Sequence, residues 1–171
     1  GTATKLVEVS LNNQTGKVNR LLAKPYIVKV TDAYANAVAG HQVDYAVTAG
    51  GGSINGLSSV KALTDASGYA TVTLRLGTSV GTNTVAVSAA GLQGSPLTFT
   101  ADAQAGIPSR FFEISGNRQK GSFGQTLPFP FVVGVTDSFA NPVANHPVQF
   151  KVSTGNGSLN GLGLASVLTN T

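Results

Sequence analysis

Two histidines and two aspartates recur at equivalent places in this sequence, and they are the side chains best suited to chemistry. His41 and His146 lie 105 residues apart, as do Asp32 and Asp137. Imidazole and carboxylate groups bind metal ions, and histidine titrates near neutral pH. A metal site needs several such ligands, and the sequence does not gather a set around either pair. We therefore expect the histidines to lead into a strand and the aspartates to cap their own turns, with calcium binding at the aspartates as the alternative.

The acidic residues of the first 105 positions do not suggest a catalytic pair. Hydrolysis uses two carboxylates, or a nucleophile beside a base. Here each acid stands on a separate strand or turn: Glu8, Asp32, Asp44, Asp65 and Asp102. The sequence has no cysteine, which excludes a thiolate metal site and a disulfide framework. We predict no catalytic residue, no cofactor and no metal site, and we expect the chain not to be an enzyme.

Glycine-rich segments can cradle a phosphate group, and the chain has two of them. Gly50-Gly51-Gly52 has the counterpart Gly155-Asn156-Gly157, and Asn55-Gly56 has the counterpart Asn160-Gly161. A phosphate loop also needs the N-terminus of a following helix and usually a lysine, which these segments lack. We predict turns instead, in which glycine adopts positive φ at little steric cost.

The composition favours strands and argues against a nucleic-acid partner. Only 11% of the residues are charged, 21 are glycine, and Val, Ala, Thr, Ser and Asn are abundant. The net charge of +4 is spread along the chain, with no basic run interleaved with aromatic residues. No segment approaches the roughly 18 consecutive apolar residues of a membrane span. We therefore predict an all-β protein with no nucleic-acid partner and no membrane span in this segment.

A long internal repeat organises the chain. Residues 25–57 align without a gap with residues 130–162, at an offset of 105. The offset predicts a complete domain at residues 1–105 and the N-terminal part of a second one at residues 106–171. Both copies keep the same alternation of apolar residues, so the same strand faces are predicted to be buried twice.

The first repeat reads as seven or eight short strands separated by turn residues. We expect them at residues 5–10, 26–31, 43–47, 60–64, 69–76, 82–89 and 97–103, with an irregular segment at residues 12–24. One face of each later strand is apolar and the other carries mostly hydroxyl groups. This pattern is typical of a β-sandwich. The short joint at residues 105–108 predicts domains set end to end with limited bending.

Several phrases of the sequence resemble group 1 bacterial immunoglobulin-like domains, the invasin and intimin type. The phrases are VTDAYANAVAG, GGGSING, LTDASGYATVTLRLG and GTNTVAVSA, and they stand in the family's usual order. One departure is that Ala35 and Ala140 stand where the family commonly has glycine. The resemblance implies tandem immunoglobulin-like β-sandwiches in an extracellular or cell-surface bacterial protein, and it implies no reaction.

These features predict a structural stalk or fibre segment of a bacterial adhesin-like protein. Its expected partners are neighbouring immunoglobulin-like domains of the same or a sister chain, a surface or host receptor, and further copies in a homopolymer. The alternative is a carbohydrate- or ligand-binding accessory module of a secreted multidomain enzyme. For that function, the aromatic residues expected to be available for ligand contact are Tyr34, Tyr69 and Phe139.

The second repeat lacks part of the predicted core. The missing counterparts are those of Val72, Leu74, Leu76, Val85, Val87, Leu97 and Phe99. At about 1.5–3 kcal/mol for each buried side chain, their loss amounts to about 10–20 kcal/mol, against about 5–15 for a whole domain. We therefore expect that residues 106–171 do not hold together alone and that the natural chain continues past Thr171. A neighbouring chain that supplies the strands is the alternative.

Overall fold

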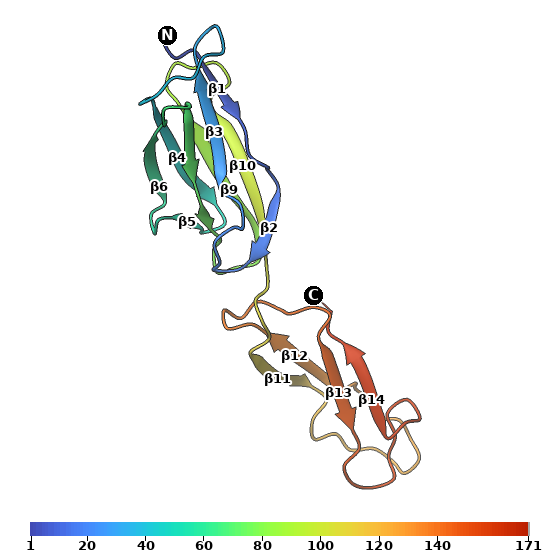
Figure 1. Ribbon diagram of the computed structural model, residues 1–171. Helices are drawn as coiled ribbons and strands as arrows, with labels where there is room; N and C mark the ends of the chain where they lie inside the picture. The colour runs from blue at the N-terminus through green and yellow to red at the C-terminus, as the bar shows by residue number, and fades with distance from the viewer. Residues whose placement is uncertain (171) are drawn as a thin grey trace. The chain divides into compact units, whose positions relative to one another are not determined.

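The computed structural model describes residues 1–170 and is built from fourteen strands, β1 to β14, joined by turns (Figure 1). The all-β fold class predicted from the sequence is confirmed. No helix that is long and apolar enough to cross a membrane occurs among the described residues. The chain divides into a first compact unit, Gly1–Gln104, and a second unit that begins at Ala105.

The first unit is a sandwich of two sheets with a short ribbon at one side. One sheet has the strand order β1 (Lys5–Glu8), β3 (Tyr26–Thr31), β7 (Tyr69–Val72). The other has the order β2 (Gln14–Lys17), β10 (Leu97–Gln104), β9 (Gly81–Ser88), β4 (Gln42–Ala49), β6 (Ser59–Leu63). The ribbon pairs β5 (Ser53–Ile54) with β8 (Leu74–Arg75). In Figure 1, β1 and β3 lie in front of β9 and β10, so the layers face each other.

Alternation along the strands places one continuous core between these sheets. Tyr26, Val28 and Val30 of β3 are fully buried, while Ile27 and Lys29 between them are only partly covered. The ring of Tyr26 stacks on that of Phe99 from the opposite sheet, with 4.5 Å between centroids. Such a stack adds to the stabilisation that burial of both rings supplies. The predicted inward faces of these strands are confirmed.

Two buried tyrosine hydroxyls tie one sheet to the other. Tyr26 Oη donates to the carbonyl of Thr100 at 3.0 Å, and Tyr45 Oη donates to the carbonyl of Ala70 at 2.9 Å. Burial raises the pKa of Tyr26 to about 12 and also raises the pKa of Tyr45, so both phenols stay protonated donors. Each hydroxyl satisfies its own hydrogen-bonding need while joining a strand of one layer to a strand of the other.

The expectation of an irregular segment at residues 12–24 is wrong in part, because β2 (Gln14–Lys17) lies within it. This strand runs parallel to β10, with Ala101 opposite Gln14 and Gln104 opposite Lys17. The sequence Gln-Thr-Gly-Lys has no alternation of apolar and polar residues, so no local sequence pattern predicts a strand there. The exposed edge of β10 supplies the pairing partner, and Gly16 lets the segment approach the side chain of Leu76.

The single strand predicted at residues 69–76 is divided in the structure. It changes partner at Thr73: β7 pairs with β3, whereas β8 pairs with β5. Val47, predicted to point inward, is only partly buried but does pack against the core, opposite Val85 of β9. The pairing of β4 with β9 shifts register just after it, between Val47 and Ala49, where the strand leaves the core.

The turns explain several residue choices. Asn55 and Gly56 both have positive φ, 51° and 80°, and join Ile54 to Leu57 through a reciprocal pair of backbone hydrogen bonds. This is the geometry of a type I′ turn, which favours Asn-Gly. Ala35 and Ala140 also have positive φ, 65° and 66°, a region that costs a non-glycine residue free energy. Both turns therefore have the backbone conformation that glycine adopts most easily, although alanine occupies the position.

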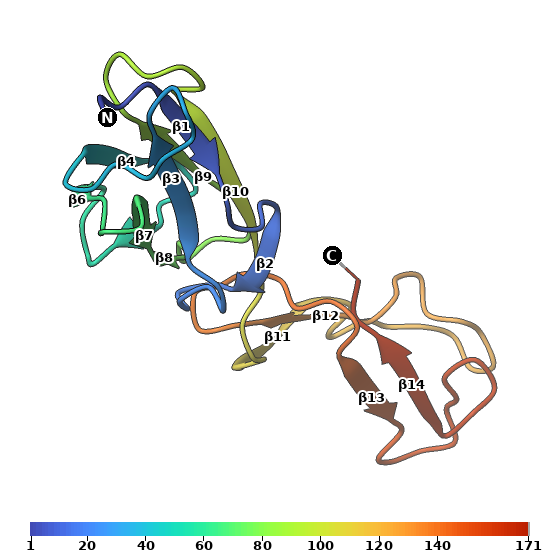
Figure 2. The ribbon, with the colours of Figure 1, turned by 45° about the horizontal axis from the view of Figure 1, so that its top comes forward.

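The second unit repeats the early strands of the first in the same register. Its strands are β11 (Arg110–Ser115), β12 (Val132–Thr136), β13 (Pro147–Lys151) and β14 (Leu164–Leu168). β11 pairs with β12 as β1 pairs with β3, and β13 pairs with β14 as β4 pairs with β6. Figure 2 shows these two antiparallel pairs as separate ribbons. Among residues 105–170 no further strand joins either pair.

The same faces that are buried in the first unit are largely open in the second. Phe131, the counterpart of Tyr26, is 47% exposed, and Phe150, the counterpart of Tyr45, is partly exposed. Only Val135 and Val148 are buried hydrophobic residues among the described part of this unit. The difference arises because the strands that cover the core of the first unit, β7, β9 and β10, have no counterparts within residues 105–170.

We predict that Ala35→Gly stabilises the first unit by about 0.5–1 kcal/mol, because glycine removes a left-handed strain of about 1–2 kcal/mol at an entropic cost below it. Ala33→Gly in the same turn is the matched control, since Ala33 is not among the residues with positive φ. It should destabilise by up to about 1 kcal/mol. Urea unfolding can be followed by tyrosine fluorescence, because all four tyrosines lie in this unit. Equal effects of the two changes would contradict the strain argument.

We also predict that Phe99→Ala destabilises the first unit by about 3–5 kcal/mol, since it removes the ring that stacks on Tyr26 and leaves a cavity. Leu63→Ala, at a side chain that is 67% exposed, should change the free energy of unfolding by no more than about 0.5 kcal/mol. Calorimetry of both variants gives the comparison. A small loss at Phe99 would show that the two sheets do not depend on this contact.

Candidate functional site

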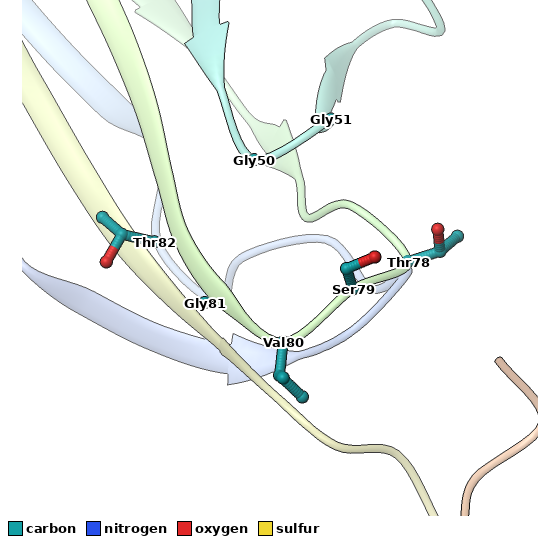
Figure 3. A pocket seen from close by; sticks show the side chains of 7 residues that line it. All are labelled: Gly50, Gly51, Thr78, Ser79, Val80, Gly81 and Thr82. Atoms are coloured by element: carbon teal, nitrogen blue, oxygen red, sulfur yellow. The ribbon is translucent and has the colours of Figure 1, made fainter. Parts of the chain in front are cut away.

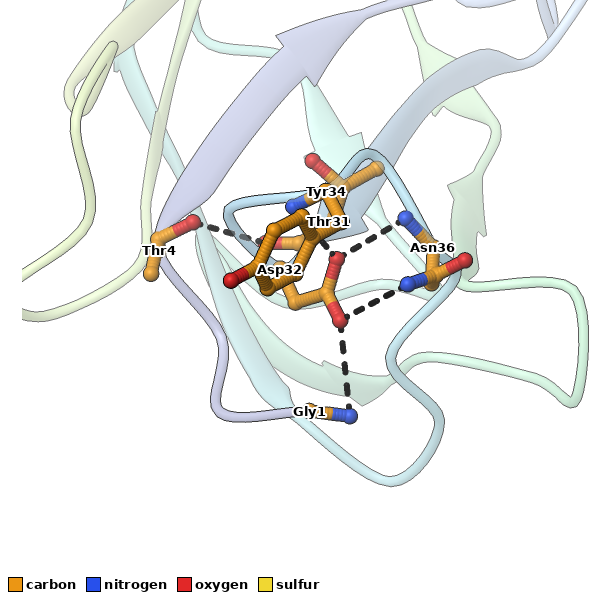
Figure 4. A network of polar contacts seen from close by, with 6 residues as sticks. All are labelled: Gly1, Thr4, Thr31, Asp32, Tyr34 and Asn36. Carbon is orange, nitrogen blue, oxygen red and sulfur yellow. Dashed lines mark hydrogen bonds and ion pairs between the residues drawn. The ribbon is translucent and has the colours of Figure 1, made fainter.

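The recurring Asp32 closes the turn that follows β3. Its Oδ1 accepts hydrogen bonds from the backbone N–H groups of Tyr34 and Asn36, both at 2.9 Å. Its Oδ2 accepts from the side-chain amide of Asn36 at 3.1 Å and faces the ammonium group of Gly1 at 3.5 Å. Figure 4 shows these donors converging on one carboxylate.

Asp137 repeats the arrangement in the second unit. Its Oδ1 accepts from the backbone N–H groups of Phe139 and Asn141 at 2.9 Å, and its Oδ2 accepts from the backbone N–H of Gly106 at 2.8 Å. Gly106 is the counterpart of Gly1. Each aspartate therefore binds the first residue of its repeat to the turn that follows β3 or β12. This role is structural.

The donors around both carboxylates stabilise the charged form. The side-chain amide of Asn36 is the main cause that lowers the pKa of Asp32. Burial alone would raise the pKa of Asp137, but the hydrogen bonds from Asn141, Gly106 and Phe139 together lower it. A calcium ion would have to displace these N–H donors to reach the oxygens. Within residues 1–170 no group of three or more His, Cys, Asp or Glu side chains is placed to hold a metal ion.

The two histidines also occupy matching structural places. The backbone N–H of His41 donates to Thr64 Oγ1 at 2.9 Å, and Thr64 Oγ1 donates to the carbonyl of Val38 at 2.7 Å. His146 and Thr169 repeat the first of these bonds at 2.9 Å. In these bonds the histidine contributes its backbone, at the entrance to β4 or β13, and the imidazole rings are partly exposed.

The other acids of the first unit act singly. Asp65 Oδ1 accepts from the backbone N–H groups of Ser67 and Tyr69 and so closes the turn before β7. Asp102 accepts from Thr82 Oγ1 at 2.6 Å across β10 and β9, and Asp44 accepts from the side-chain amide of Gln42. The structure brings no two of these carboxylates together, which leaves no acid pair of the kind that hydrolysis uses.

The Gly50–Gly52 segment borders a small pocket of about 270 Å³ (Figure 3). Its lining is uncharged and consists of Gly50, Gly51, Thr78, Ser79, Val80, Gly81 and Thr82. The glycines have a packing reason, because a Cβ at Gly50 would lie 2.6 Å from the Cα of Asn83. Asn83 is fully buried and its Oδ1 accepts from the backbone N–H of Gly77 at 3.0 Å. This segment is a turn packed around a buried amide, with no cation to attract a phosphate.

A larger apolar groove of about 410 Å³ lies in the second unit, between its two strand pairs. Phe112, Ile114, Phe131, Phe150 and Val167 are among its lining residues. Phe112 and Ile114 were not singled out in the sequence, although the run Phe-Phe-Glu-Ile in β11 is the signal that could have found them. Most of the residues that line the groove are apolar, and none of them is charged.

We predict that acid destabilises the first unit through Asp32. Its folded pKa is below the ordinary value of about 3.9, so the stabilisation is present above that value and is lost as the pH falls through the folded pKa. Asn36→Ala should lower stability at pH 7 and flatten this acid dependence, since it removes the main donor. Thr48→Ala, a change at an exposed strand residue, should keep the wild-type dependence. Urea midpoints from about pH 6 to about pH 2 would measure it. An unchanged slope in Asn36→Ala would refute the role given to this amide.

No protein-family model matches the sequence, and no curated protein matches it. Solved structures do match. InvD of Yersinia pseudotuberculosis gives a TM-score of 0.56 at 14% identity, covering 100% of this chain and 55% of that chain. The Escherichia coli adhesin FdeC gives a TM-score of 0.55 at 18% identity, covering 99% of this chain and 57% of that one.

This chain thus spans between half and three fifths of the length of those two proteins. Identities this low support a common fold and leave function open. The match agrees with the two sheets and the strand pairing described above. The chain therefore has the all-β immunoglobulin-like sandwich fold of bacterial adhesin domains, which confirms the resemblance carried by its sequence motifs.

Proposed function

We propose that this chain is a structural segment of a bacterial cell-surface or secreted adhesin-like protein, in which tandem immunoglobulin-like units give reach and stiffness. The proposal assigns it no enzymatic activity. It rests mainly on one observation, the parallel pairing of β2 with β10 near the two ends of the first unit. The likeness to the adhesin FdeC supports the extracellular setting.

Parallel pairing makes the first unit resistant to a pull on its ends. β2 lies early in the unit and β10 is its last strand, and Gln14–Lys17 face Ala101–Gln104 in register. The backbone N–H of Val18 adds a bond of 2.9 Å to the carbonyl of Gln104. When the ends of the unit are drawn apart, two parallel strands must slide past each other, so all the ladder bonds are loaded together.

A second set of bonds fastens the N-terminal strand at its other end. The backbone N–H of Leu6 donates to the carbonyl of Gln93, and that of Gln93 donates to the carbonyl of Thr4, both at 2.9 Å. The segment that enters the unit is therefore held to the residues before β10 as well as to β10 itself. Both attachments must fail before the core is exposed.

Carbohydrate binding, the competing function, would use exposed aromatic rings. Tyr34 is 87% exposed at the tip of the turn closed by Asp32. Tyr69 is partly buried, with its ring 5.2 Å from the ammonium of Lys29, so it does not extend that surface as a free platform. Phe139, at the equivalent turn of the second unit, is 43% exposed. Tyr34 and Phe139 stand on separate turns, one in each unit, which supports the structural role better than a sugar site built from these three rings.

The proposal predicts that the first unit resists force in one direction more than in another. Because the chain has no cysteine, pairs of engineered cysteines give unambiguous handles. Handles at Gly1 and Gln104 shear the β2–β10 ladder, whereas handles at Lys17 and Gln104 peel it from one end. Single-molecule pulling should give a clearly higher unfolding force in the first geometry.

Equal forces in both geometries would contradict a mechanical role for the ladder. Surface exposure is a separate test, made by treating intact cells of the source organism with protease and following the loss of the chain. A chain that is protected on intact cells, or one that binds a glycan in a manner that Tyr34→Ala abolishes, would overturn the proposed function.

A further inference from the structure

The segment that joins the two units is held by a hydrogen bond on each side. The carbonyl of Gln104, the last residue of β10, accepts from the backbone N–H of Val18 at 2.9 Å. The backbone N–H of Gly106 donates to Asp137 Oδ2 at 2.8 Å. The first bond lies within the first unit and the second bond lies within the second unit. Between the two bonded groups stands a single residue, Ala105.

The carboxylate that holds Gly106 is itself fixed in place. Asp137 is 1% exposed, and its Oδ1 accepts from the backbone N–H groups of Phe139 and Asn141 at 2.9 Å. The side-chain amide of Asn141 also donates to Oδ2, at 2.9 Å. A hydrogen bond to an ionised acceptor is stronger than one between neutral groups. Because the buried side chain cannot follow a moving backbone, its bond resists displacement of Gly106.

The next attachment of the chain to the second unit is at Ser109. Its backbone N–H donates to the carbonyl of Thr136 at 2.8 Å. Between the two attachments, the side chain of Ile107 is 83% exposed, and Pro108 has no N–H group to donate. Loss of the bond from Gly106 would therefore extend the freely rotating part of the joint from Ala105 alone to residues 105–108.

The first repeat begins with the same arrangement. Asp32 Oδ2 faces the nitrogen of Gly1 at 3.5 Å, and the backbone N–H of Thr4 donates to the carbonyl of Thr31 at 2.9 Å. A Cβ added at Gly1 would collide with Oδ2 of Asp32, so glycine permits this close approach. The aspartate and the glycine that it holds are therefore a feature of the repeat, present wherever a unit of this kind begins in the chain.

We infer that Asp137 limits bending between the two units, because its bond to Gly106 confines the hinge to Ala105. Asp137 acts as a positioning residue, which fixes the backbone at the entrance to the second unit. This inference rests on the proposed function for its purpose, since a structural segment needs stiff joints. The bonds concerned differ from those of the β2–β10 ladder, so the pulling experiment and the experiment below can fail separately.

The variant Asp137→Asn removes the bond and keeps the turn. The side-chain oxygen of asparagine can still accept from the backbone N–H groups of Phe139 and Asn141, whereas its NH2 group cannot accept from Gly106. Asp32→Asn makes the same change at the equivalent turn of the first unit, away from the joint, and is the matched control. Amide spectra of both variants verify that the two units stay folded.

Pulsed electron paramagnetic resonance of the full chain measures the freedom of the joint, because the sequence has no cysteine that would take up a spin label by itself. The labels are carried by Lys61→Cys in β6 and Ser166→Cys in β14, two exposed positions, one in each unit. The excursion of a flexible segment grows as the square root of its length, so Asp137→Asn should widen the distance distribution about twofold. Insertion of Gly-Gly-Gly between Gln104 and Ala105 lengthens the hinge with the bond intact and calibrates this width.

Hydrogen exchange at the Gly106 amide tests the bond directly. In the unaltered chain we expect exchange to be slower than in an unstructured peptide by about tenfold to a hundredfold, the value of a hydrogen bond to a charged acceptor. Asp137→Asn should abolish this protection, whereas Asp32→Asn should leave it unchanged.

Four results would show that the inference is wrong. Fast exchange at Gly106 in the unaltered chain would mean that the bond does not form. An unchanged distance distribution in Asp137→Asn would mean that the bond does not limit bending. Equal widening in Asp32→Asn would mean that general destabilisation is the cause. A distribution that narrows on addition of calcium would mean that a metal ion stiffens the joint in place of the N–H donor.

Discussion

The stack of Tyr26 on Phe99 is the contact on which the first unit depends, because it joins the two sheets at the centre of the sandwich. A sheet with one apolar face gains stability only when another layer removes that face from water. Here the covering layer comes from late in the chain: β9 and β10 close over strands formed much earlier. The fold is therefore built on contacts between residues distant in sequence.

The aspartates, histidines and glycines were the residues best suited to chemistry. In the structure they stabilise turns and strand ends of the two units. Asp32 and Asp137 gather backbone donors at the turn after β3 or β12, and His41 and His146 enter the next strand beside a threonine hydroxyl. Gly50 makes space for the buried amide of Asn83. Because the carboxylates of Asp32 and Asp137 already accept hydrogen bonds from donors of their own turns, these places serve stability. The candidate functions rest on the strands themselves.

The second unit shows what the same early strands do when no later strands cover them. Its two antiparallel pairs keep the register of the first unit, yet the rings of Phe131 and Phe150 stay accessible. Local pairing and turns thus suffice to place the strands, whereas burial needs a further layer.

The all-β class, the inward faces of the long strands and the turns could be predicted from the amino-acid sequence, because alternation, Asn-Gly pairs and a repeated motif are local signals. It also identified the family resemblance that the fold match confirms. The three-dimensional contacts were needed to show that the polar segment 14–17 is a strand, that the run 69–76 changes sheet at Thr73, and that the pairing of β4 with β9 shifts register after Val47. These features depend on which edge is free to pair and how two layers meet, and no local pattern encodes such contacts between distant parts of a chain.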